Sequence, residues 1–218
     1  MARTHELPML YFAAMLIGLF GGTFDPPHLG HLALCREAVS DLGVERLLWL
    51  LTPDPPHKAH HHITPLPHRL RMVELALEGT SYELSRVDID RPPPHYAVDT
   101  VRILREQYPQ AELLYLMGGD SLNDLPRWHR AADFLQTLDF IEVMHREGEL
   151  PDLPSLEQRL PGLQAKVRFV QARRVDISAS QVRALIRKGK PFEHLLPPGV
   201  AGYIRENKLY LPTTPLQN

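Results

Sequence analysis

The chain has 218 residues, of which 44% are hydrophobic and 23% are charged, and its formal net charge is −2. These values fit one globular domain and exclude a fibrous repeat or wholesale disorder. The charge gives no global attraction to nucleic acid or to an anionic membrane, so neither is expected as a partner and any anion site must be built locally.

The beginning of the chain is expected to be an extension or a misassigned start. The run from Met9 to Phe20 is apolar enough to imitate a signal peptide, but it is too short to span a bilayer and leads directly into Gly21. Met15 precedes a short buried-strand pattern. We therefore predict a dispensable segment at residues 1–14 and a single domain at residues 15–218.

Five short apolar runs predict strands that are buried on both faces, as in a parallel sheet. Three of them end at Phe20, Thr52 and Gly118, and two more span Phe140 to His145 and Val167 to Gln171. Between them, helical spacing links three sets of residues: His31, Cys35, Ala38 and Leu42; Leu70, Val73 and Leu77, closed by Gly79; and Ala97, Val101, Leu104 and Tyr108, stopped by Pro109. This alternation predicts a Rossmann-like, doubly wound parallel α/β sheet.

The single cysteine, Cys35, excludes an internal disulfide and suits a reducing cytoplasm. We expect it to be a small core residue on the first helix.

Three proline-rich segments are predicted to be loops, because proline cannot continue the interior of a helix or a sheet. They are Pro53 to Pro67, Pro92 to Pro94 and Leu150 to Pro161. The first two follow strands, or nearly so, at the edge where doubly wound sheets bind ligands. They are therefore candidates for substrate loops.

The string GGTFDPPHLGH, from Gly21 to His31, joins the first strand to the first helix. Paired glycines let the backbone approach a phosphate, and the helix start offers unpaired amides. His28 and His31 are three residues apart, so both can supply donors or positive charge to the same anion. Capping or surface histidines would explain the spacing alone, but the whole string favours an anion site. Asp25 is expected to shape the turn.

A second anion site is suggested by the string ISASQVR, from Ile177 to Arg183. Ser178 is a good helix N-cap, and Gln181 three residues later completes a capping box, which is a sufficient structural explanation by itself. The same helix start also offers amides to a phosphate, and the long Arg183 side chain can reach back toward an anion held there.

The first string resembles the GTFDPxHxGH signature of nucleotidyltransferases that share the HxGH motif, and ISASQVR resembles their ISxTxxR-type motif. The resemblance implies a Rossmann-like fold that binds ATP together with Mg²⁺. It implies catalytic roles for His28, His31 and Arg183, which meet the charge of the triphosphate. The ATP-binding residues that we infer are Gly21, Gly22, Thr23, Phe24, His28, His31, Gly118, Asp120, Ser178, Ser180 and Arg183.

Further segments extend the resemblance from about Leu16 to Tyr210 and match the nicotinate-nucleotide adenylyltransferase branch. They are PPHK from Pro55, followed by Arg69 and Met72; HYAVDT from His95; MGGDS from Met117; Trp128-His129; and a closing helix from Tyr203 to Tyr210. The substrate-binding residues implied are Lys58, Tyr96, Ala97, Thr100 and Trp128. His95 replaces a usual serine and Ala97 a common threonine, which leaves backbone amides as the donors.

Two of these residues keep structural alternatives. Asp120 could orient a ribose hydroxyl or hold Mg²⁺ through water, or it could simply cap the next turn. Trp128 could stack near nicotinate, as the resemblance implies, or belong to the core.

The cluster His57, His60, His61 and His62 is interpreted as a loop over an anionic substrate and not as a metal site, because consecutive histidines do not readily converge on one ion.

The implied reaction is the attack of nicotinate mononucleotide on the α-phosphorus of ATP, giving deamido-NAD and pyrophosphate. The alternatives are another nucleotidyltransferase, with nicotinamide mononucleotide or pantetheine phosphate as acceptor, and a non-catalytic nucleotide-binding regulator on the same fold. The sequence leaves the formation of a homo-oligomer open.

Overall fold

One sheet of six parallel strands organises the chain in the computed structural model, which describes residues 14–55, 63–145, 151–171 and 177–212. The strand order is β3-β2-β1-β4-β5-β6. The strands are β1 (Leu16–Gly22), β2 (Arg46–Leu51), β3 (Glu83–Ser85), β4 (Glu112–Gly118), β5 (Phe140–His145) and β6 (Val167–Gln171). This is the predicted doubly wound α/β sheet, and its order reverses between β1 and β4. The predicted segment at residues 1–14 lies outside the described residues except for Ala14.

Five of the strands were predicted, and β3 was missed. It has three residues, pairs with β2 from Leu48 to Leu50, and is not fully buried. A strand this short at the edge of a sheet lacks the apolar run that reveals the others.

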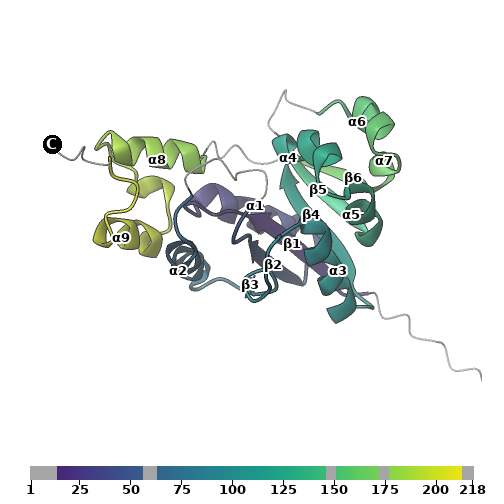
Figure 1. Cartoon of the computed structure of the whole chain (residues 1–218), viewed down its shortest axis with the longest axis horizontal. Helices are drawn as coiled ribbons and strands as arrows, with labels where there is room; N and C mark the ends of the chain where they lie inside the picture. Colours follow the sequence, from purple (N-terminus) through teal and green to yellow (C-terminus); the bar gives the residue numbers. More distant parts are fainter. Residues whose placement is uncertain (1–13, 56–62, 146–150, 172–176, 213–218) are drawn as a thin grey trace, which may run out of the picture.

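The helices cover both faces of the sheet (Figure 1). They are α1 (Leu29–Leu42), α2 (Leu66–Leu77), α3 (Ala97–Gln107), α4 (Gly119–Asp124), α5 (Ala131–Thr137), α6 (Leu153–Arg159), α7 (Leu163–Lys166), α8 (Ala179–Arg187) and α9 (Pro198–Glu206), with short 3-10 turns η2 (Leu125–Arg127) and η3 (Glu193–Leu195). The three predicted helices are confirmed as α1, α2 and α3. The closing helix ends at Glu206, and a turn carries the chain on to Tyr210.

Two of the loop predictions are wrong in part. The segment Leu150 to Pro161 contains α6, and the segment Pro53 to Pro67 ends inside the first turn of α2. Both helices carry proline at the first or second position, where a missing backbone N–H has no intrahelical partner to lose. Asp152 also caps α6 by accepting a hydrogen bond from the Ser155 amide at 3.2 Å.

Three apolar clusters hold the layers together. One packs α3 and α5 against one face of the sheet, and another packs α1 and part of α2 against the opposite face. Cys35 belongs to the second and is 0% exposed, which confirms its core position. The third joins α2, α8 and α9, which lie together at one end of the molecule in Figure 1. Within the described ranges, no helix is long and apolar enough to cross a membrane.

Glu142 on β5 is an unusual member of the interior. It is 1% exposed, and neither carboxylate oxygen has a hydrogen-bond partner among the residues that the structure describes. Burial, partly offset by the charge of Arg168, raises the pKa of Glu142 from 4.5 to about 7. The folded state therefore binds more protons than the unfolded state between these two values. The contribution of Glu142 to the free energy of unfolding is therefore fully present below pH 4.5 and is lost as the pH rises through 7.

Replacing Glu142 by glutamine is expected to stabilise the fold at pH 8 by about 1–3 kcal/mol, because the variant buries no charge. The gain should shrink strongly at pH 5, where the wild-type carboxyl is already protonated. Urea unfolding at both pH values measures the effect, with the exposed Glu106→Gln as control. A gain of equal size at both pH values would contradict the explanation.

Candidate active site

The predicted ATP-binding residues lie where the strand order reverses. The string from Gly21 to His31 begins with the last two residues of β1, and Gly118 to Asp120 begin with the last residue of the neighbouring strand β4. In doubly wound sheets, ligands bind outside the carboxyl ends of the strands at such a reversal. The fold therefore brings these two predicted segments to one edge.

His28 and His31 form a stacked pair at the start of α1, with ring centroids 3.6 Å apart. The backbone amide of His28 donates to Nδ1 of His31 at 3.1 Å, so the ring proton of a neutral His31 is assigned to Nε2. His28 is buried, and burial lowers its pKa from 6.5 to about 4. His28 is therefore neutral at pH 7. The sequence predicts that it supplies either hydrogen-bond donors or positive charge to an anion, and a neutral ring is suited to donating.

The glycines of this string have packing roles. A Cβ at Gly21 would lie 2.1 Å from the Tyr115 hydroxyl, and a Cβ at Gly22 would lie 2.8 Å from the ring of Phe24. Phe24 itself has a φ of 47°, a left-handed conformation that costs energy for a bulky residue and is enriched at functional sites. A Cβ at Gly30 would meet the His28 ring at 2.9 Å and the Ile177 carbonyl at 3.3 Å. Gly30 thus lets the segment before α8 approach the two histidines.

Helix α8 brings the second motif to the same place. Ser178 caps it by accepting from the Gln181 amide at 3.1 Å, as predicted. Nη1 of Arg183 donates to the carbonyl of Asp25 at 2.6 Å, and Nη2 lies 3.5 Å from Oγ of Ser180. The structure therefore joins the two motifs across 158 sequence positions.

Arg69 of α2 was placed in the site region by the sequence, but its role was missed. It is 2% exposed and donates to four backbone carbonyls, those of Thr23, Thr52, Pro53 and Thr64. The chain after β1 and the two ends of the loop after β2 are thereby held together. No sequence signal identifies such partners, because every residue has a carbonyl.

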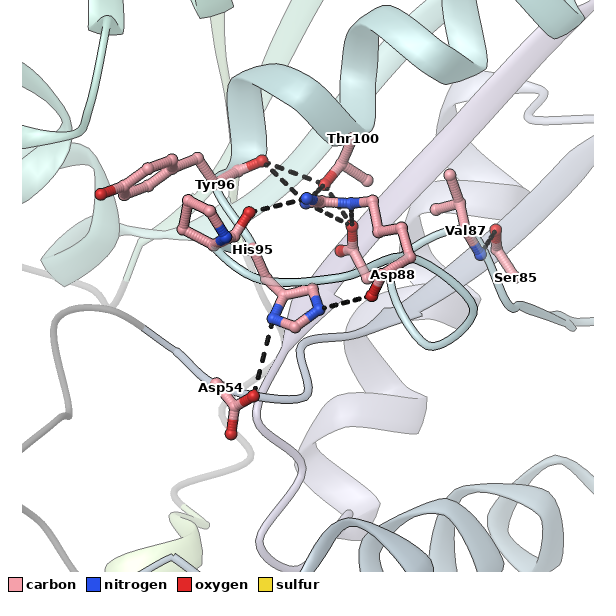
Figure 2. A network of polar contacts seen from close by, with 9 residues as sticks. Asp54, Ser85, Val87, Asp88, His95, Tyr96 and Thr100 are labelled. Atoms are coloured by element: carbon pink, nitrogen blue, oxygen red, sulfur yellow. Dashed lines mark hydrogen bonds and ion pairs between the residues drawn. The ribbon is translucent and has the colours of Figure 1, made fainter.

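A buried polar network supports the predicted acceptor side, before α3 (Figure 2). Nε of Arg91 donates to Asp88 at 2.9 Å, and Nη1 donates to the Pro94 carbonyl at 2.7 Å. The hydroxyl of Thr100 donates to the same Asp88 oxygen at 2.7 Å. Thr100, for which the sequence predicts substrate binding, is 2% exposed, and its hydroxyl also lies 3.2 Å from the Tyr96 carbonyl, so its side chain supports the turn that leads to Tyr96.

His95 occupies the position of the usual serine, and its side chain is directed away from the start of α3. Nε2 of the ring lies 3.2 Å from the Arg91 carbonyl, and Nδ1 lies 3.8 Å from the carboxylate of Asp54 (Figure 2). The ring is therefore hydrogen-bonded within the turn before α3 through Nε2, whereas Nδ1 has no hydrogen-bond partner among the described residues.

Aromatic rings flank the first turn of α3. Tyr96, its N-cap, stacks on His129 with ring centroids 4.0 Å apart. Trp128 packs edgewise on Tyr115 and Phe134 and is half-buried, which supports the alternative that it belongs to the core. Stacking of Trp128 on nicotinate stays a prediction. Ala97 begins α3 and is half-buried. Lys58 and the cluster His57 to His62 lie outside the described residues.

The residues present fit a magnesium ion that arrives with ATP. The described part of the chain contains no cluster of three or more histidine, cysteine or acidic side chains that could form a metal cage. Mg²⁺ commonly keeps several waters and binds through substrate phosphates with one or two carboxylates. Asp120 is exposed in the first turn of α4, directly after β4, and its carboxylate is of the kind that suits this role.

Comparison with known proteins gives concordant results. A cytidylyltransferase-like family model matches residues 19–185. A relative from Dehalococcoides mccartyi, curated as a probable nicotinate-nucleotide adenylyltransferase, is 38% identical over 88% of this chain and 96% of its own length. A relative of the same name from Thermomicrobium roseum is 40% identical over 89% of this chain and 91% of its own.

A solved structure of Plasmodium falciparum nicotinic acid mononucleotide adenylyltransferase complexed with NaAD has the same fold. Its TM-score is 0.74 at 17% identity, and the match covers 89% of this chain and 96% of that one. The family model spans most of the chain, and the curated relatives extend the match to nearly its whole length. The chain therefore belongs to the cytidylyltransferase-like family and, within it, to the nicotinate-nucleotide adenylyltransferases.

Proposed function

We propose that this chain transfers the adenylyl group of ATP to nicotinate mononucleotide, in the cytoplasm, with release of pyrophosphate. The observation that carries the proposal is the meeting of the two motifs at one edge of the sheet, where Arg183 bonds the loop that leads to His28 and His31. The curated relatives, which bear the name of this activity, support the choice of reaction.

In the proposed reaction, an oxygen of the acceptor phosphate attacks the α-phosphorus of ATP. The bond from this phosphorus to the bridging oxygen breaks, and pyrophosphate leaves with the bonding electrons. The acceptor phosphate is already anionic at neutral pH, so no protein nucleophile is needed. Catalysis then consists of positioning and charge stabilisation.

We assign the triphosphate to the start of α1 and the start of α8. Nε2–H of His31 would donate to a phosphate oxygen, and Arg183 would meet the charge that develops on the leaving pyrophosphate. Asp120 would help to hold the Mg²⁺ that accompanies ATP, and the bound ion would supply further neutralisation of the triphosphate charge.

We assign the nicotinate ring to the first turn of α3. The first amides of a helix have no intrahelical partner and carry partial positive charge, so the backbone at Tyr96 and Ala97 can bind a carboxylate. The exposed ring of His129, stacked on Tyr96, adds a flat surface nearby.

Pyrophosphate release tests the proposal. The protein with ATP and Mg²⁺ is offered nicotinate mononucleotide, nicotinamide mononucleotide or phosphopantetheine in separate assays. We expect rapid release with the first acceptor. Release only with phosphopantetheine would move the chain to another branch, and no release with any acceptor would favour a nucleotide-binding regulator.

A further inference from the structure

Asp25, in the loop after β1, receives hydrogen bonds from three distant parts of the chain. One carboxylate oxygen accepts from the Tyr210 hydroxyl at 2.6 Å, and the other accepts from the Thr64 amide at 3.2 Å. Its main-chain carbonyl accepts from Arg183 at 2.6 Å. Asp25 is 7% exposed, so these bonds form with little competition from water.

The Tyr210 contact is the longest in sequence, because the two residues are 185 positions apart. Burial and the neighbouring Asp25 charge raise the pKa of Tyr210, so the hydroxyl stays protonated and donates. A hydrogen bond from a hydroxyl to a buried carboxylate belongs to the stronger class.

The backbone of Tyr210 also indicates a fixed residue. Its φ is 64°, in the left-handed region that is uncommon for residues with a Cβ. Such conformations persist where surrounding contacts determine them. The bond to Asp25, together with the approach of the hydroxyl to Sδ of Met72 at 3.9 Å, provides these contacts.

We propose that Tyr210 is a positioning residue for the ATP site, which acts through Asp25 to fix Arg183 against the loop after β1. The proposal rests on the function proposed above, in which Arg183 meets the triphosphate. Tyr210 restrains the side chain of Asp25, and Arg183 is bonded to the main chain of the same residue. A displacement of Asp25 therefore moves the anchor of the guanidinium.

The test compares Tyr210→Phe with Tyr203→Phe. Both variants lose one hydroxyl in the C-terminal region, and the Tyr203 hydroxyl bonds His68 at 2.9 Å, which makes it a matched control. Small displacements of a positioning group cost up to about 100-fold in rate. We expect Tyr210→Phe to lower kcat about 10- to 100-fold and to weaken the binding of α,β-methylene-ATP about tenfold, with the KM for nicotinate mononucleotide within about twofold of wild type. Tyr203→Phe should leave all three values nearly unchanged.

A double-mutant cycle tests whether Tyr210 affects the ATP site through Asp25. If Tyr210 acts through Asp25, adding Tyr210→Phe to Asp25→Asn should lower kcat no further than Asp25→Asn alone. Equal effects of Tyr210→Phe and Tyr203→Phe, or additive losses in the double variant, would overturn the proposal.

The binding measurement separates this proposal from the proposed function. An inactive wild-type protein would reject the function, whereas the affinity for the ATP analogue would still report whether Tyr210 supports the site. If Tyr210→Phe does not fold, Asp25→Asn tests the same hydrogen bond, and an unchanged affinity in that variant would reject the role.

Discussion

His31→Ala is expected to lower the turnover of adenylyl transfer about 10²- to 10³-fold, the range seen when one preorganised donor to developing charge is lost. The amide of His28 donates to Nδ1 of His31 and so leaves the ring proton on Nε2. His28→Ala is expected to cause a loss of the same size, because it removes the ring stacked on His31. Steady-state pyrophosphate release at saturating ATP measures both effects.

His31→Gln provides a matched comparison, because the glutamine amide carries N–H groups near the position of Nε2. It should retain more activity than His31→Ala. His68→Ala, a change of a half-buried histidine on α2, serves as the control for general damage. Near-normal turnover in both alanine variants would remove the histidines from the triphosphate site.

Nicotinate mononucleotide is expected to be preferred over nicotinamide mononucleotide by about 10- to 10³-fold in kcat/KM. The two acceptors differ by a carboxylate in place of an amide. A carboxylate only accepts hydrogen bonds, whereas an amide would bring two hydrogens toward the amides at the start of α3. Arg91, which bonds the Pro94 carbonyl just before this turn, is itself paired with Asp88 at 2.8 Å, so the preference rests on the helix-start amides and not on this cation.

The preference is measured with both acceptors at the same concentrations of Mg²⁺ and ATP. Each unmatched polar group costs about 1–3 kcal/mol, so one or two conflicts account for the expected range. The side chain of His95 is bonded elsewhere and the side chain of Ala97 has no donor, so the preference depends on backbone groups. Equal efficiencies would reject the nicotinate assignment and leave adenylyl transfer intact.

The parts of the fold that could be predicted are those with a local signal. The runs around Leu48 and Leu114 are apolar after the first, charged residue of each strand, and the spacing of Cys35 and Ala38 marks a helix face. The string from Gly21 to His31 and the Ser178 cap are also local patterns. Each could be recognised without knowing what it contacts.

The missed features depend on distant partners or on position within a helix. The proline-rich sequence around Pro154 predicts a loop, although proline is compatible with the first turn of α6. The network around Asp88 and Arg91 joins a turn to a helix, and only the folded chain reveals it. The sequence does not indicate that Tyr210 contacts Asp25, because a side-chain hydrogen bond between residues so far apart in the chain produces no periodic pattern in the sequence.

The bonds from Arg69 define where the loop after β2 can be redesigned. Its four acceptors are main-chain atoms, including those of Thr52, Pro53 and Thr64 at the two ends of the loop. Any amino acid supplies the same carbonyl, so sequence diversity between these ends does not remove an acceptor. Substitutions between these two ends that keep Arg69 and the chain length are therefore expected to leave its four hydrogen bonds in place.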